Sequence, residues 1–150
     1  MASKKVDYDN IIWQILLIAF IVLLADQFTK ILIRSYVPEG ASAFSGVVSI
    51  THSENSGVAF SMLQGMQWLS ITFSIIAIAC IIIFFKQYNT VLKRIGIGLL
   101  LGGIVGNLID RLFIGTVTDF IDLHFWPVFN IADSAIVAGV ILLVVSFWKE

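Results

Sequence analysis

Two aspartates in the last third of the sequence, Asp119 and Asp133, are fourteen positions apart. Asp133 lies in the first turn of an apolar stretch that Asn130 can cap, and the helix dipole there favours a carboxylate. Two carboxylates close together near an apolar boundary cannot both ionise easily, so they share one proton. Aspartic proteolysis uses such a pair, one member activating water and the other protonating the scissile carbonyl oxygen. The spacing leaves two interpretations open: a catalytic dyad, or a capping Asp133 with Asp119 as a solvated loop residue.

Other reactive side chains give weaker signals. Asp119, Asp122 and His124 resemble a sparse ligand set, but closed metal sites show tighter and richer clusters, so no metal site is predicted. His52 and His124 have no serine or cysteine nucleophile in a recognisable motif, which disfavours acyl transfer. The single cysteine, Cys80, lies in an apolar run and is interpreted as a packing residue.

Several charged and amide side chains interrupt the apolar stretches. Asp26 and Lys30 are four positions apart with the acid first, the better order for an ion pair along a helix. Helical spacing puts Asn107 and Asp110 on one face of a later stretch. Arg111 adjoins Asp110 and cannot face it, so each must find partners on other elements. Ionisable residues within a membrane span cost about 2.5 kcal/mol or more and usually face the bundle interior or a wet cavity.

The elements that must position these residues are apolar helices. Hydrophobic residues make up 59% of the 150 residues and charged residues 13%, which indicates a membrane protein. The net charge of -1 gives no sign of a nucleic-acid partner. No linker or repeat divides the chain, so residues 1–150 are expected to form one domain with an all-α membrane core. Four apolar stretches are long enough to cross a bilayer: 11–33, 68–85, 95–114 and 129–148. Gly98, Gly102 and Gly106 predict close helix packing, which we expect to dock the last stretch on the third.

The distribution of basic residues predicts an orientation. Six of the nine Lys and Arg residues fall at one set of span ends, namely Lys4, Lys5, Lys86, Lys93, Arg94 and Lys149. The positive-inside rule therefore puts both termini in the cytoplasm and the first and third loops outside. The first outer loop, about 40–64, reads as strand 47–52, turn 53–57 and strand 58–62. Residues 116–123 alternate with period two and could pair with it in a small sheet outside the hydrocarbon.

Five motifs in order resemble bacterial lipoprotein signal peptidase, also called signal peptidase II. They cover most of the chain and are, in sequence order, Asp26-Gln27-Phe28-Thr29-Lys30, Asn55-Ser56-Gly57-Val58-Ala59-Phe60, Gly106-Asn107-Leu108-Ile109-Asp110-Arg111, Gly115-Thr116-Val117-Thr118-Asp119-Phe120 and Phe129-Asn130-Ile131-Ala132-Asp133. Each motif alone would be weak, whereas all five on four spans are specific.

The resemblance implies an aspartyl endopeptidase with Asp119 and Asp133 as its dyad. Its substrates would be diacylglyceryl-modified prolipoproteins, cut just before the lipidated cysteine at the outer face of the bacterial cytoplasmic membrane. The implied partners also include membrane lipids and globomycin-type inhibitors, and no cofactor is implied. The implied substrate-binding residues are Asn55, Asn107, Arg111 and Asn130, and the implied supporting residues are Asp26, Lys30, Gly57 and Asp110. The implied fold has four membrane helices, a small extracytoplasmic β-cradle and a short surface helix.

An alternative from another class is a small transporter or channel subunit that uses the aspartates as a proton or cation relay. Both classes explain acids within membrane spans. A relay should distribute its acids across the bilayer, whereas these gather at one end. Intramembrane aspartyl proteases with a Gly-x-Gly-Asp motif are disfavoured because that tetrapeptide is absent from the sequence.

Overall fold

The computed structural model describes residues 7–44, 46–57 and 67–149. Most of them lie in helices, and a small sheet completes the fold. In chain order the elements are α1 (Tyr8–Tyr36), β1 (Ser42–Phe44), β2 (Ser49–Asn55), α2 (Gln67–Ile83), the 3₁₀ turn η1 (Phe85–Gln87), α3 (Val91–Phe113), β3 (Val117–Asp122) and α4 (Ile131–Trp148).

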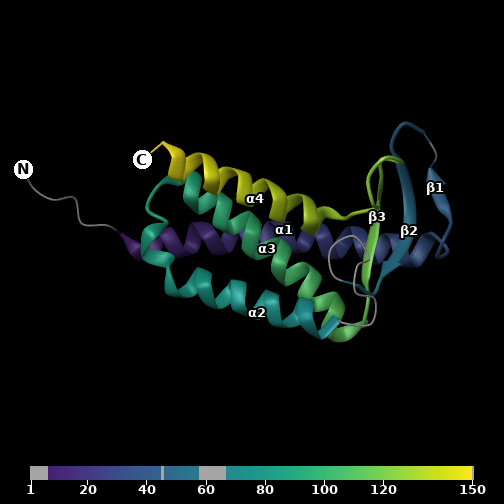
Figure 1. The fold of residues 1–150 in the computed structure, drawn as a ribbon, viewed down its shortest axis with the longest axis horizontal. Helices are drawn as coiled ribbons and strands as arrows, with labels where there is room; N and C mark the ends of the chain where they lie inside the picture. Colours follow the sequence, from purple (N-terminus) through teal and green to yellow (C-terminus); the bar gives the residue numbers. More distant parts are fainter. Residues whose placement is uncertain (1–6, 45, 58–66, 150) are drawn as a thin grey trace, which may run out of the picture.

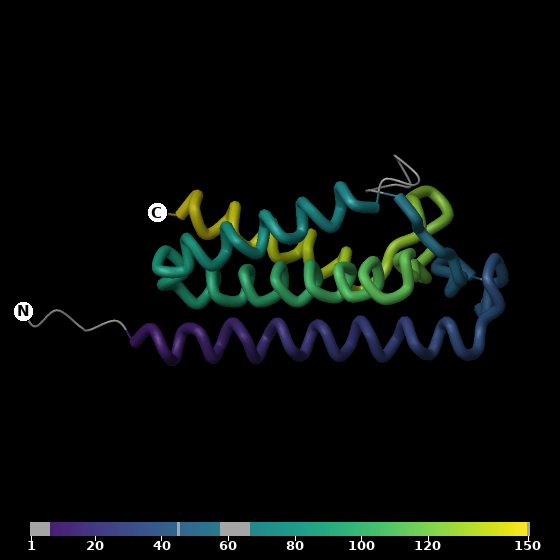
Figure 2. Tube along the Cα trace, turned by 90° about the horizontal axis from the view of Figure 1, so that it is seen from below, coloured from purple at the N-terminus to yellow at the C-terminus, as the bar shows by residue number. Residues whose placement is uncertain are grey.

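The four helices run side by side along the long axis of the molecule, and the sheet lies across one end (Figure 1). We call this the sheet end and the opposite one the distal end. The beginning of α1 and the end of α4 both lie at the distal end (Figure 2). Helix α3 is the centre of the bundle, because α1, α2 and α4 all pack against it. The site residues on α1 and α4 are thus carried by helices that both pack against α3, which carries the remaining helical site residues.

Three of the helices are long and apolar enough to cross a membrane: α1, α3 and α4. They cover the predicted stretches 11–33, 95–114 and 129–148 to within four residues at each end. Helix α2 covers most of the predicted stretch 68–85, but it has 17 residues and ends at Ile83. The structure therefore gives three candidate membrane helices and one shorter apolar helix, and the prediction of four full spans is not confirmed.

The sheet is antiparallel with the order β1-β2-β3. The predicted pairing of 116–123 with the first loop is confirmed by β2 and β3, whose register places Ser53 opposite Asp119. The predicted turn at 53–57 is wrong at its start, because β2 continues to Asn55 along its ladder with β3. The predicted strand 58–62 lies outside the described residues. Among those described, no separate helix follows the sheet on the bundle surface, so the implied surface helix is not observed there.

Glycines set the distance between α3 and its neighbours. A Cβ on Gly102 would lie 2.6 Å from the Ala19 carbonyl oxygen of α1. Gly103 instead abuts the carbonyl of Ala132 at the start of α4, and a Cβ on Gly139 of α4 would lie 2.6 Å from the Gly96 carbonyl oxygen. The expectation that the 98/102/106 row docks α4 is therefore wrong for its first two members. Gly98 and Gly102 pack against α1, because they occupy a different face of α3 from Gly96 and Gly103.

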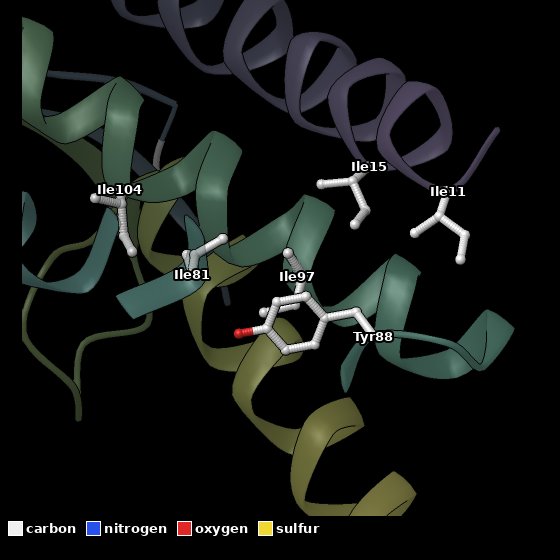
Figure 3. Packing of buried hydrophobic residues seen from close by; sticks show 6 residues of the cluster. All are labelled: Ile11, Ile15, Ile81, Tyr88, Ile97 and Ile104. Carbon is white, nitrogen blue, oxygen red and sulfur yellow. The ribbon is translucent and has the colours of Figure 1, made fainter. Parts of the chain in front are cut away.

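The distal half of the bundle has an apolar core. Figure 3 shows its residues, which come from α1, α2, α3 and the connection between α2 and α3: Ile11, Ile15, Ile81, Tyr88, Ile97 and Ile104. Ile97 of α3 is 2% exposed and belongs to the same cluster as Tyr88 and the α1 residues Ile11 and Ile15. This core fixes the helices relative to one another without any polar contact among these side chains.

Candidate active site

Asp119 is carried by β3 at the sheet end of the bundle. Its side chain is 3% exposed. Asn55 at the end of β2 donates from Nδ2 to Asp119 Oδ2 at 3.0 Å, and Asn130 donates from Nδ2 to Oδ1 at 2.6 Å. The N–H of Gly57 donates to Asn55 Oδ1 at 2.9 Å, which turns the Asn55 NH₂ group toward Asp119. The interpretation of Asp119 as a solvated loop residue is therefore wrong.

Asp133 lies in the first turn of α4 and forms a capping box with Asn130, so the predicted capping role of Asn130 is confirmed. The Asp133 N–H donates to Asn130 Oδ1 at 2.9 Å, and the Asn130 N–H donates to Asp133 Oδ2 at 3.2 Å. The other carboxylate oxygen, Oδ1, accepts from Asn107 Nδ2 at 2.8 Å. Capping thus uses one oxygen of Asp133, while the other faces a side chain of α3.

Asn130 joins the two carboxylates into one site. It is fully buried, and its NH₂ group faces both Asp119 Oδ1 and, at 3.2 Å, Asn107 Oδ1. Burial, followed by the charge of Asp133, raises the pKa of Asp119 to about 7, against the hydrogen bonds from Asn55 and Asn130. The Asp119 carboxyl therefore keeps its proton to a much higher pH than an exposed aspartate does.

Arg111 supplies positive charge beside this pair. It lies in the last turn of α3 and interacts electrostatically with Asp133, Asp119 and Asp110. Its hydrogen bonds to the described residues are long, at 3.5 Å each, from Nη2 to the Gly57 carbonyl and from Nη1 to the Asn107 carbonyl. Among the described residues, these two long bonds engage two of the five guanidinium N–H groups.

Behind the pair lies a buried charged cluster. The Lys30 ammonium is 2.8 Å from Asp26 Oδ2, as the spacing predicts, and 2.8 Å from Asp110 Oδ2. All three side chains are 0% exposed. Asp26 Oδ1 also accepts the N–H of Ala132 at 2.9 Å, so the cluster ties α1 to both α3 and the first turn of α4. Three of the four residues that the resemblance implies as supports thus meet in one place, whereas Gly57 lies beside Asn55.

Some residues of this region are missed by the sequence analysis. Arg34 of α1 lies 3.7 Å from Asp110 and donates to the Thr118 hydroxyl at 2.9 Å. It stands one helical turn after Lys30, and that spacing is a signal that could have found it. Gln27 donates to Asp110 Oδ1 and to the Gly106 carbonyl, both at 3.1 Å.

Glu54 of β2 is also missed. Its carboxylate accepts from Thr116 at 2.6 Å, Thr118 at 2.8 Å and His52 Nε2 at 2.9 Å. Burial raises the pKa of Glu54, but these hydrogen bonds outweigh it and hold that pKa below its usual value. Burial lowers the pKa of His52, and its bonds to Glu54 and the Val37 carbonyl outweigh that and raise it. Glu54 therefore anchors β2 to β3 next to the Asn55–Asp119 contact.

Asp122 and His124 do not join Asp119 in a metal site. Within residues 7–44, 46–57 and 67–149, no group of three or more His, Cys, Asp or Glu residues is arranged to hold a metal ion. His124 Nε2 lies 3.1 Å from Ser49 Oγ and 2.9 Å from the Gly46 carbonyl. A carbonyl only accepts, so Nε2 carries a hydrogen and cannot serve as a base for Ser49. This contact closes the loop before β2 and is not a catalytic triad.

Comparison with known proteins gives one consistent result. The family model described as signal peptidase (SPase) II matches residues 18–149. The lipoprotein signal peptidase of Geobacillus thermodenitrificans is 44% identical over 140 residues, covering 88% of this chain and 88% of that protein. The lipoprotein signal peptidase of Halothermothrix orenii is 36% identical over 137 residues, covering 89% and 94%.

Solved structures agree with the family match. Two structures of bacterial membrane enzymes, determined by the in meso method at 2.3 Å and 1.9 Å resolution, have TM-scores of 0.85 and 0.82 with this chain. Both are 33% identical in sequence; the first covers 99% of this chain and 93% of its own, the second 100% and 99%.

Proposed function

The chain belongs to the signal peptidase II family and is a protease, and from this premise we propose that Asp119 and Asp133 are its aspartic dyad. The observation that carries the proposal is the shared asparagine: Asn130 caps Asp133 through Oδ1 and binds Asp119 through Nδ2 at 2.6 Å. An asparagine that needed only to cap α4 would have no reason to hold a second, buried acid. The arrangement supports two carboxylates acting as one unit.

The proposed reaction is direct hydrolysis by water. Buried Asp119, with its pKa of about 7, holds the shared proton and gives it to the scissile carbonyl oxygen. Asp133 accepts N–H groups on both oxygens and takes a proton from the attacking water, whose oxygen bonds to the carbonyl carbon. Collapse of the tetrahedral species breaks the C–N bond: the leaving nitrogen takes the proton that Asp133 received from water, and Asp119 regains its proton from a hydroxyl of the tetrahedral species. The products are a free carboxylate and a free amine.

The resemblance implies that Asn55, Asn107 and Asn130 all bind substrate, and the contacts of these asparagines support two different roles. Asn130 is 0% exposed and Asn107 is 5% exposed, and both direct their NH₂ groups at the dyad carboxylates. We assign both to positioning the dyad instead of touching substrate. Arg111, with its long protein contacts, and Asn55, at the rim of the sheet, remain the proposed substrate-binding residues.

The relatives are named lipoprotein signal peptidases, which supports lipoprotein precursors as the substrates. We propose that these precursors carry a diacylglyceryl-modified cysteine. The dyad lies where α3 ends and α4 begins, which supports cleavage at a bilayer surface with the lipid still in the membrane. We propose that α2 also crosses the bilayer, that both termini are cytoplasmic and that the sheet faces outward in a bacterial cytoplasmic membrane. Sensitivity to globomycin-type inhibitors stays a prediction. The transporter alternative has no support, since the relatives are peptidases.

Asparagine variants test the dyad. We expect Asp119→Asn and Asp133→Asn each to lower cleavage of a purified diacylglyceryl-modified precursor by about 10³-fold or more, because each removes one proton-transfer group. Asp122→Asn, on the same strand but bonded to His124, is the matched control and should cleave normally. Thermal unfolding in detergent checks that the variants are folded. Near-normal turnover by either folded dyad variant would refute the assignment.

A further inference from the structure

We propose that Lys30 is a positioning residue for the dyad, acting through the amide of Asn107 on Asp133. The inference rests on the proposed function, since it assumes that Asp133 takes part in the reaction. It concerns a side chain that is 0% exposed and is therefore out of reach of any substrate.

Three oxygen atoms surround the Lys30 ammonium. Asp26 Oδ2 and Asp110 Oδ2 lie at 2.8 Å, and Asn107 Oδ1 accepts a hydrogen bond at 2.9 Å. An ammonium group has hydrogens to donate and no acceptor. It forms ion pairs with the two carboxylates and donates a hydrogen bond to Asn107 Oδ1. The two acids hold the ammonium in place, and its hydrogen bond to Asn107 connects it to the side chain on α3 that contacts Asp133.

The contact with Asn107 decides which way its amide faces. Lys30 can only donate, so it requires the oxygen of the amide on its own side. The NH₂ group must then point the other way, and there it donates to Asp133 Oδ1 at 2.8 Å. Asn130 Nδ2, at 3.2 Å from Asn107 Oδ1, favours the same orientation.

Reversal of this amide would place an acceptor against the Asp133 carboxylate. Two acceptors without a hydrogen between them repel, so Asp133 Oδ1 would lose its N–H donor and its fixed direction. A displacement of about 1 Å at a catalytic group can cost about 10²-fold in rate. Lys30 therefore secures the geometry of the dyad from behind, without contact to either dyad carboxylate in the described hydrogen bonds and ion pairs.

A double-mutant cycle tests this route. Lys30→Met and Asn107→Leu are each expected to lower kcat by about 10²-fold with KM within about threefold of wild type. The double variant should be no slower than the slower single variant, because the two residues act in series. Losses that multiply would show independent roles and overturn the proposal. Arg94→Met, which removes a cation bonded to Gln14 and Asn89 at the distal end, is the control expected to keep kcat.

Lys30→Met leaves the buried Asp26 and Asp110 without their cation, which could unfold the protein. A second variant removes one of these acids as well. Lys30→Met with Asp110→Asn keeps the net charge of the cluster at its wild-type value of one negative charge and still lacks the ammonium. If it folds and turns over within threefold of wild type, Lys30 does not position the dyad. Failure of both variants to fold would also overturn the assignment, since the ammonium would then serve the fold. If the losses in kcat of the two single variants multiply in the double variant, the role of Lys30 is refuted and the dyad assignment stands. An active Asp119→Asn variant would refute the dyad itself.

Discussion

The sheet end and the distal end of the helix bundle are held together by different interactions. At the distal end, isoleucines of α1, α2 and α3 form one apolar cluster with Tyr88, through contacts that have no preferred direction (Figure 3). At the sheet end, Asp26, Lys30 and Asp110 are 0% exposed and lie 2.8 Å apart at each ion pair, and the equally buried Asn130 bonds to Asn107 and Asp119. Apolar packing brings the helices together, and the directional contacts determine where each carboxylate points.

The difference predicts where substitutions are tolerated. An apolar core accepts small changes of shape at modest cost, because its neighbours can adjust. A buried charge network does not, since removal of one partner leaves another charge without compensation. Activity should therefore be far more sensitive to changes at the sheet end than to changes of similar size at the distal end.

The largest effect is expected from Asp110→Leu at the sheet end. This change removes one of the two acids beside Lys30 and a partner of Gln27 and Arg34. We expect a loss of about 3 kcal/mol in the free energy of unfolding, together with a large fall in kcat because the cluster supports Asn107. Denaturant unfolding in detergent and a cleavage assay measure both. A variant with normal stability and kcat would show that the cluster does not hold the site.

A smaller effect is expected from Ile97→Val at the distal end. Ile97 is 2% exposed, and loss of one methylene from such a core typically costs about 1 kcal/mol. Unfolding should shift by this amount while kcat and KM stay at wild-type values, because the residue makes no contact with the dyad. A fall in kcat of tenfold or more would contradict the claim that activity depends mainly on the sheet end, since it would couple the distal core to catalysis.

Local patterns explain what could be predicted from the sequence. The Asp26–Lys30 pair follows from four-residue spacing, the cap at Asn130 follows from its place before an apolar helix, and the pairing of β3 follows from its alternation. Each of these depends on neighbours in the chain or on a period of a single element. The same holds for the long apolar helices, which composition alone reveals.

Contacts between distant elements explain what was missed. The first part of the turn expected at 53–57 is strand instead, because its polar residues pair with β3. Glu54 also accepts hydrogen bonds from Thr116, just before β3, and from Thr118 within it. Gly98 and Gly102 face α1 and not α4, which depends on how three helices share the surface of α3. The contact of Asn107 with Asp133 likewise exists only after α4 has docked.

The pH dependence of kcat/KM tests the central claim most directly, that Asp119 and Asp133 share one catalytic proton. Asp119, with a pKa of about 7, is protonated below that pH and ionised above it. The account predicts that kcat/KM for a diacylglyceryl-modified precursor falls about tenfold per unit as pH rises beyond about 7, since the proton donor is lost. A kcat/KM that rises through pH 7, as for a neutral histidine base, or that stays flat to pH 9 would contradict it.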